Sequence, residues 1–198
     1  MAFKTERLTC PCCGFPVQVS DTECPAGHPL NISTFNSVYA MPAPMVNKYA
    51  NTFRKELADA PDDQGLNYSL GICYLKLKLY DKALAAFENA MEDNFDNSEV
   101  FFYAAICLLQ GKKPFLHQRP TIDKVLEYMN AALMIEEKGI YFYFLAYVKY
   151  DYFTRKYLNH APNYTELLAR ANQYGVSHYD AVQLFSILQV EQPSVFSI

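Results

Sequence analysis

Cysteine and histidine residues near the N-terminus stand at spacings that suit a bound metal ion. The run Cys10-Pro-Cys-Cys13-Gly14 is followed by Cys24-Pro-Ala-Gly-His28. Thiolate and imidazole donors in a four-coordinate array favour zinc over harder cations. If Cys10, Cys13, Cys24 and His28 are all ligands, no coordination position stays open for a substrate. The pattern therefore predicts a structural site that folds its segment and does no catalysis.

A Cys-x2-Cys turn followed by glycine resembles a zinc knuckle, in which the permissive backbone of Gly14 lets amides point at the first thiolates. Two such turns, joined by a short hairpin over 15–20, resemble a small zinc ribbon. That resemblance implies a structural zinc. Cys12 could compete with Cys10 or Cys13 as a ligand. Free cysteines in an unstructured tail and a redox Cys-x2-Cys are the alternatives, although no thioredoxin-like strand and helix surround the pair.

The rest of the chain offers no combination of residues typical of an active site. Its glycines are scattered singly, so no phosphate-binding loop is present, and there is neither a Gly-x-Ser-x-Gly elbow nor a His-Glu-x-x-His helix. His117, His160 and His178 each stand alone. Cys73 and Cys107 lie in apolar segments and are predicted to be packed small hydrophobes. We therefore expect a protein that is not an enzyme.

Composition and charge narrow the class further. The chain has 198 residues, a hydrophobic content of 51% and a net charge of −4, which exclude a disordered protein and disfavour a reader of nucleic-acid phosphates. The four clustered cysteines favour a metal site over a disulfide framework. The longest apolar run, Ile140 to Val148, is too short to span a membrane, and the N-terminus has no apolar leader. These features predict a cytoplasmic protein.

Helical periodicity begins near residue 44 and predicts an all-α fold. Helices are expected over 44–59, 64–78, 81–93, 98–110, 122–136, 140–157 and 178–190, with one more between Asn163 and Gly175. Asp81 is expected to cap the third helix. Asn163 with Glu166, and Ser177 with Asp180, stand at capping-box spacing. The predicted organisation is a zinc ribbon over 1–33, a linker over 34–43, helices over 44–191 and a tail over 192–198.

Two segments repeat one pattern at an offset of 42 residues (123 − 81). Asp81-Lys-Ala-Leu-Ala-Ala-Phe-Glu-Asn-Ala-Met91 aligns with Asp123-Lys-Val-Leu-Glu-Tyr-Met-Asn-Ala-Ala-Leu133. This resembles the tetratricopeptide repeat (TPR), a helix–turn–helix unit of about 34 residues. The first copy matches the signature at Leu70, Gly71, Tyr74, Ala83, Phe87 and Ala90. Asn67 replaces its first aromatic residue and Phe95 its closing proline.

A second copy begins near residue 98 and keeps Phe101 and Ala132, with an insertion of about eight residues relative to the usual repeat. A third, over 139–174, has only the length of a helix pair. The resemblance covers about 44–191 and implies a right-handed TPR-like superhelix of helix hairpins. A helical bundle without repeats, carrying one accidental match, is the alternative.

In that family the first helix of each pair lines a concave groove for a partner helix or peptide. The resemblance places nine residues there: Tyr68, Ile72, Leu75, Phe102, Ile106, Leu109, Tyr143, Tyr147 and Tyr150. The aromatic run from Tyr141 to Tyr157 carries nine Tyr or Phe residues on more than one helical face. An uncovered patch of this kind marks an interaction site. The alternative is that the ribbon, the linker 34–43 or the tail Gln192–Ile198 fills the groove.

The predicted function is protein–protein binding by an adaptor or scaffold with a structural zinc ribbon. A nucleic-acid-associated factor that uses the ribbon as its reader is one alternative, although Lys4 and Arg7 are balanced there by Glu6, Asp21 and Glu23. A self-associating structural protein is another. The insertion Gly111–Pro120 carries Lys112, Lys113 and Arg119 without an acidic residue, and could be a plain connector or a contact for an anionic partner.

Overall fold

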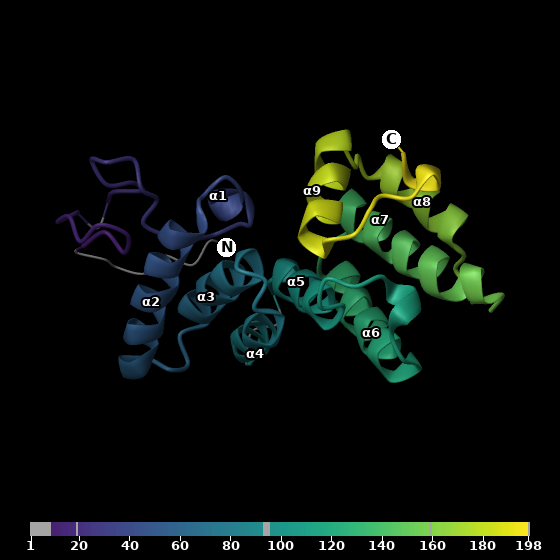
Figure 1. Cartoon of the computed structure of the whole chain (residues 1–198), viewed down its shortest axis with the longest axis horizontal. Coiled ribbons are helices and arrows are strands. Elements are labelled where there is room, and N and C mark those ends of the chain that lie inside the picture. Colours follow the sequence, from purple (N-terminus) through teal and green to yellow (C-terminus); the bar gives the residue numbers. More distant parts are fainter. Residues whose placement is uncertain (1–8, 19, 93–95, 159, 198) are drawn as a thin grey trace. The chain divides into compact units, whose positions relative to one another are not determined.

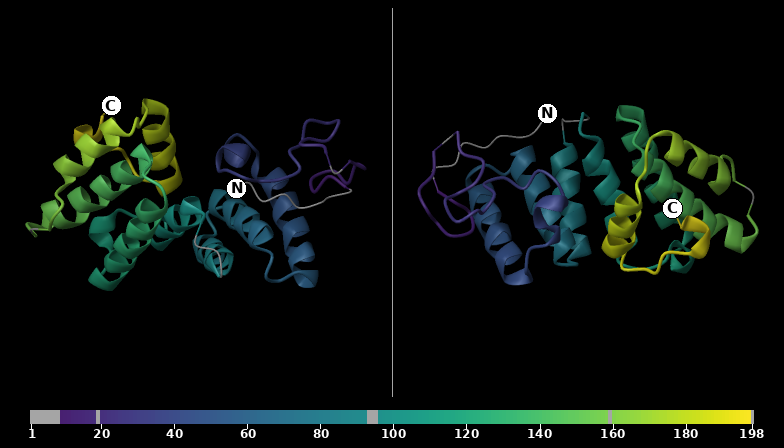
Figure 2. Two further views of the ribbon diagram at one scale, coloured as in Figure 1. Left: turned by 180° about the vertical axis from the view of Figure 1, so that it is seen from behind. Right: turned by 90° about the horizontal axis from the view of Figure 1, so that it is seen from above.

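The protein is described here by a computed structural model, which describes residues 9–18, 20–92, 96–158 and 160–197. These residues form nine α-helices, with shorter 3-10 and π-helical segments in some of the connections, and contain no β-strand (Figures 1 and 2). The expected all-α class is therefore confirmed. Residues named in the sequence analysis that lie outside the described ranges are Lys4, Glu6, Arg7, Phe95 and Ile198.

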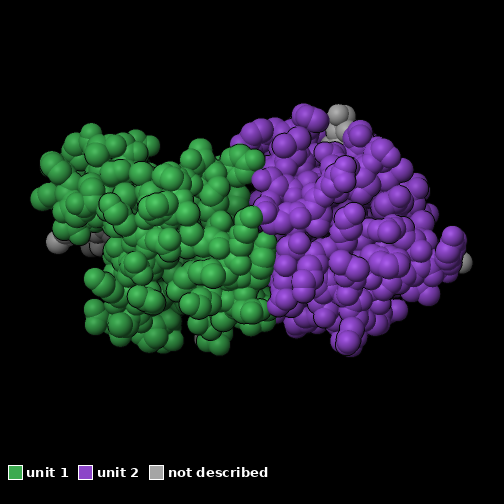
Figure 3. Space-filling model, in the orientation of Figure 1, with its two compact units in different colours: residues 1–94 green, residues 95–198 purple. Residues whose placement is uncertain are grey.

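The chain divides into two compact units, residues 1–94 and residues 95–198, which Figure 3 colours separately. In the first unit, α1 (Asn36–Tyr39) and α2 (Ala43–Asp59) both pack on α3 (Gln64–Lys76), which pairs with α4 (Tyr80–Met91). The linker expected over 34–43 thus contains a short helix. The carboxylate of Asp63 caps α3 by accepting a hydrogen bond from the Leu66 amide at 2.8 Å.

Gly71 lets α3 and α4 approach closely. A Cβ atom at this position would lie 2.6 Å from Cε1 of Phe87, a distance that no real side chain tolerates. Phe87 is fully buried and its ring contacts that of Tyr68 with centroids 6.0 Å apart. The small residue and the large one therefore fit each other across the helix crossing, as the sequence pattern predicted.

The second unit begins with α5 (Ser98–Leu108), which pairs with α6 (Arg119–Ile135). It continues with α7 (Gly139–Val148), which pairs with α8 (Tyr164–Gln173) and also contacts α6 and α9 (His178–Leu188). Both predicted capping boxes are present at the starts of α8 and α9. None of the helices in the described part of the chain has the length and apolar character needed to cross a membrane.

Four local predictions are corrected. Leu79 is the N-cap of α4 and Asp81 lies in its first turn, because the helix begins at Tyr80. The hairpin expected over 15–20 is replaced, among the described residues, by isolated bridges from Thr9 to Pro16 and from Glu23 to Pro29. These two prolines lack the amide that would extend a strand ladder.

The helix expected over 140–157 changes form after Val148. It continues as a π-helical segment, η2 (Lys149–Phe153), and a short 3-10 segment, η3 (Thr154–Lys156). The loop expected over 111–120 contains the 3-10 turn η1 (Pro114–Leu116) and ends earlier, because Pro120 fits the first turn of α6. The Phe115 amide donates to the buried carboxylate of Asp151 at 2.8 Å, so the loop is fastened to η2.

Candidate functional site

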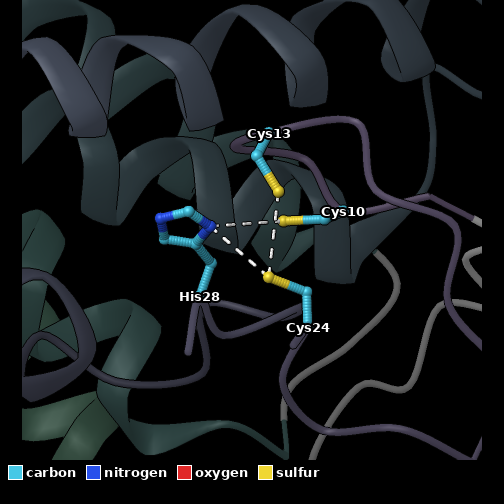
Figure 4. A group of neighbouring side chains, drawn as sticks. All are labelled: Cys10, Cys13, Cys24 and His28. Atoms are coloured by element: carbon cyan, nitrogen blue, oxygen red, sulfur yellow. Dashed lines mark hydrogen bonds between the residues drawn. The ribbon is translucent and has the colours of Figure 1, made fainter. Parts of the chain in front are cut away.

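Four side chains converge in the N-terminal segment as the cysteine spacing predicted. One donor atom of each of Cys10, Cys13, Cys24 and His28 lies within 4.8 Å of all the others (Figure 4). The Cys13 and Cys24 sulfur atoms are 3.8 Å apart, and Nδ1 of His28 is 3.4 Å from the sulfur of Cys24. A tetrahedral centre with metal–sulfur bonds of about 2.3 Å has sulfur–sulfur edges of about 3.8 Å. The four residues therefore fit a four-coordinate metal ion.

Two turns of the backbone bring these donors together. In the first, the Gly14 amide donates to the Cys10 carbonyl at 2.8 Å, with Gly14 at a φ of +72° that favours glycine. The Cys12 amide points at the Cys10 sulfur at 3.4 Å. In the second, the Gly27 amide donates to the Cys24 carbonyl at 2.8 Å. Each turn thus presents its donors on one side.

Cys12 lies outside this group of donors among the described residues. Its side chain is buried, and burial raises the pKa of its thiol. The two cysteines of the Cys-x2-Cys pattern, Cys10 and Cys13, are the ones that lie beside Cys24 and His28. The positions of the side chains thus favour Cys10 and Cys13 over Cys12 as ligands, and the ligand assignment itself stays a prediction.

The cysteines of the cluster differ in the pKa of their thiol groups. Burial raises the pKa of Cys10 to about 11. Burial also opposes ionisation of Cys24, but hydrogen bonds with the His28 and Ala26 backbone and with the Cys10 and Cys13 side chains together outweigh it and lower its pKa to about 7. A bound dication would favour the thiolate form of every cysteine ligand. Near neutral pH the thiolate form is therefore more accessible to Cys24 than to Cys10.

The candidate metal site is attached to α2 by hydroxyl groups. Tyr49 donates to the Pro29 carbonyl at 2.7 Å, and Thr52 donates to the Pro11 carbonyl at 2.8 Å. Leu30 and Ile32, which follow His28, are buried. The two turns and the first long helix are therefore packed as one structure.

The nine residues predicted to line a groove are located as follows. Eight of them are buried, and Tyr150 is half-buried. Tyr68, Ile72 and Leu75 all belong to α3. The short helix α1 packs on α3, and Lys76 donates a hydrogen bond to the Tyr39 carbonyl. The linker segment thus covers part of α3. The partner-binding role of Tyr68, Ile72 and Leu75 stays a prediction.

In the second unit, α5 and α7 meet through aromatic rings. Phe102 contacts Tyr141 and Phe144, with ring centroids 4.9 Å and 5.8 Å apart. Ile106 is 1% exposed and Leu109 is fully buried. The predicted role of these residues in binding a partner likewise stays a prediction.

The C-terminal tail lies on the aromatic residues of α7 and η2. The ring of Phe196 contacts those of Tyr143, Tyr147 and Tyr150 at centroid distances of 5.5, 5.8 and 5.5 Å. Tyr143 donates its hydroxyl hydrogen to the Phe196 carbonyl. Phe196 is 1% exposed. The chain therefore fills this groove with its own peptide, which was one of the two possibilities at the level of sequence.

Sequence reasoning missed the far wall of this groove. Phe185 of α9 and Tyr164 of α8 also contact Phe196, with centroids 6.4 Å and 6.5 Å away. We call Tyr143, Tyr147, Tyr150, Tyr164 and Phe185 the aromatic groove. Phe196 is the single aromatic residue of the segment 192–198. A single aromatic residue in a short tail was the one signal in the sequence that could have indicated this contact.

No protein-family model matches the chain, and no curated protein matches it either. Its function must therefore be inferred from its own residues and their geometry.

Proposed function

We propose that this protein is a non-catalytic adaptor, a TPR-like helical repeat that binds a partner peptide or helix and carries a structural zinc ribbon at its N-terminus. Support for the repeat comes from consecutive helix pairs, α3 with α4, α5 with α6 and α7 with α8. The close contact of Gly71 with Phe87 at the first crossing agrees with the repeat signature. Proteins built from repeated helix pairs offer extended surfaces for partners.

The observation that carries the proposal is the peptide already lying in the aromatic groove. Phe196 supplies an aromatic anchor, and its carbonyl accepts hydrogen bonds from Tyr143 and, at 2.6 Å, from Gln192. An aromatic anchor in a desolvated pocket, with fixed hydrogen bonds to the peptide backbone, is how binding sites gain affinity. A partner segment with an aromatic residue would find the same contacts when the tail leaves.

Zinc is the proposed metal. Three thiolates and one imidazole in a closed tetrahedral set suit zinc, and leave no position for a substrate. The ion would hold residues 9–32 in the form that packs on α2. A cytoplasmic location stays a prediction, because a reducing compartment would keep the clustered cysteines available as thiolate ligands.

Affinity capture from a native extract, with mass spectrometry, tests the adaptor function. The baits are wild type, Phe196→Ala and the matched control Val195→Ala, whose side chain is 46% exposed. We expect Phe196→Ala to recover a specific protein more strongly than the other two, because its groove is emptied. A synthetic peptide of residues 190–198 added in excess should release that protein. Equal and non-specific recovery by all three baits would contradict the proposal.

A further inference from the structure

A cavity of about 480 Å³ lies between α6, α7, α8 and the segment 160–162, away from the aromatic groove. Its floor is apolar and buried, and is formed by Leu126, Phe142, Leu145 and Leu167. Its mouth carries exposed residues, among them Met134, Glu137, His160 and Arg170. Cavities of about 300–1,000 Å³ with an apolar lining and a few polar groups are typical sites for small molecules.

One charged side chain among the lining residues is buried. Lys149, the first residue of η2, is 4% exposed. Its amine contacts Nδ1 of His160 and lies 5.0 Å from the centre of the Phe153 ring. Within residues 9–18, 20–92, 96–158 and 160–197, no carboxylate pairs with this amine. A buried ammonium group without an anionic partner is costly.

The other charged groups near the cavity are already paired. Arg119 binds Asp123 at 2.7 Å, and Arg170 binds Glu137 at 2.6 Å while its guanidinium lies 4.1 Å from the Phe142 ring centre. These two pairs are neutral, so the positive charge of Lys149 is unbalanced. Burial, with a smaller effect of Arg119, lowers the pKa of Lys149 to about 8. Burial also lowers the pKa of His160, which therefore accepts a hydrogen bond from the ammonium group near neutral pH.

We propose that this cavity binds a small monocarboxylate with an aliphatic chain, its carboxylate paired with Lys149 and His160 and its chain on the apolar floor. The lysine amine supplies the positive charge, and a neutral imidazole that accepts at Nδ1 carries its proton on Nε2, from which it can donate to the carboxylate. A carboxylate balances the buried charge, and the chain removes apolar surface from water. This site is independent of the adaptor function, because it uses neither the aromatic groove nor the metal ligands.

Isothermal titration calorimetry on the full-length protein tests the inference with octanoate and with 1-octanol, its neutral counterpart. At pH 7 we expect octanoate to bind one site per chain, at least about tenfold more tightly than 1-octanol. Lys149→Met should lower octanoate affinity by about tenfold or more. Lys112→Met, at an exposed position, should not change it. Equal binding of the two ligands, unchanged affinity in Lys149→Met, or no octanoate binding would overturn the proposal.

A second pair of variants avoids buried positions. Met134 is 88% exposed at the cavity mouth, so Met134→Glu and Met134→Gln should fold alike. The added negative charge should weaken octanoate binding in the first variant relative to the second. For wild type, octanoate affinity should fall about tenfold from pH 7 to pH 9 as Lys149 loses its proton. Equal octanoate affinity in both Met134 variants, or affinity independent of pH, would count against the site.

Discussion

The hydroxyl group of Tyr143 donates a hydrogen bond to the backbone carbonyl of Phe196, 53 residues further along the chain. The same tyrosine accepts a hydrogen bond from Nε2 of Gln192 at 3.2 Å. A buried tyrosine needs such partners, because an unpaired hydroxyl in an apolar environment costs free energy. The tail therefore completes the interior of the second unit as well as filling its groove.

Replacing Phe196 by alanine should destabilise the second unit. The ring is buried among five aromatic residues, and removal of a buried phenylalanine costs about 3–5 kcal/mol. Chemical denaturation followed by circular dichroism would measure the free energy of unfolding. Val195→Ala is the control and should cost less than about 1 kcal/mol, because Val195 is 46% exposed. A loss as small in Phe196→Ala as in Val195→Ala would show that the tail does not stay in the groove in solution.

Replacing Cys24 by serine should abolish stoichiometric metal binding. A tetrahedral site that loses one of four ligands binds metal much more weakly, and the N-terminal segment should lose its fold while the helices from α3 onward persist. Metal analysis by mass spectrometry and far-ultraviolet circular dichroism would check both expectations. Cys12→Ser is the matched control and should keep one ion per chain, since Cys12 lies outside the donor group. Stoichiometric zinc in the Cys24 variant would refute this ligand assignment.

Replacing Gly71 by alanine should lower the free energy of unfolding by about 1–3 kcal/mol, because the new methyl group overlaps the Phe87 ring. Thermal and chemical denaturation would measure the loss. The double variant Gly71→Ala with Phe87→Leu should recover part of it, relative to the sum of the two single changes. Strict additivity of the two changes would mean that the helices separate freely at this crossing.

Replacing Lys149 by methionine should raise stability at pH 7 by about 1–3 kcal/mol, because it removes an uncompensated buried charge. The pKa of Lys149 is lowered by burial to about 8 from an ordinary value of 10.5. Below pH 8 the wild type bears the full cost of the charge. Between about pH 8 and 10.5 the unfolded chain holds more protons than the folded one, so wild-type stability rises with pH relative to the variant.

The advantage of Lys149→Met should therefore shrink by pH 10, as measured by urea denaturation at both pH values. Lys112→Met, which removes an exposed charge, supplies the comparison and should show no such change with pH. A constant difference between wild type and Lys149→Met over this range would mean that the amine is solvated in the folded state.

Local signals in the sequence located most helices to within a few residues. Capping residues explain part of this success, since the side chains of Asn163 and Ser177 accept the amide hydrogen bonds that their capping-box spacing predicts. The change to a π-helix at Lys149 left no such signal. Asp151 lies within this segment, and its carboxylate binds Arg155, four residues further on, and the backbone amide of Phe115 in a distant loop.

The metal site was predictable because its donors lie within 20 residues and their spacing is dictated by local turns. The contents of the groove were not, since the contacts between Phe196 and Tyr143 join distant parts of the chain. The repeat pattern placed Tyr143 and Tyr147 on one helix face, but no periodicity states which segment covers that face. Only the packed structure shows that Phe185 and Tyr164 complete the aromatic groove.

The attachment of the loop after α5 to Asp151 has a practical consequence for anyone who wishes to label this protein. The ring of Phe115 contacts both Arg155 and Lys156, whose charged groups are 4.7 Å and 4.9 Å from its centre. An epitope or fluorescent group inserted beside Phe115 would have to break these contacts and the hydrogen bond to Asp151. Tyr157, with a side chain that is 97% exposed, offers an attachment point nearby where a reporter would disturb nothing that is packed.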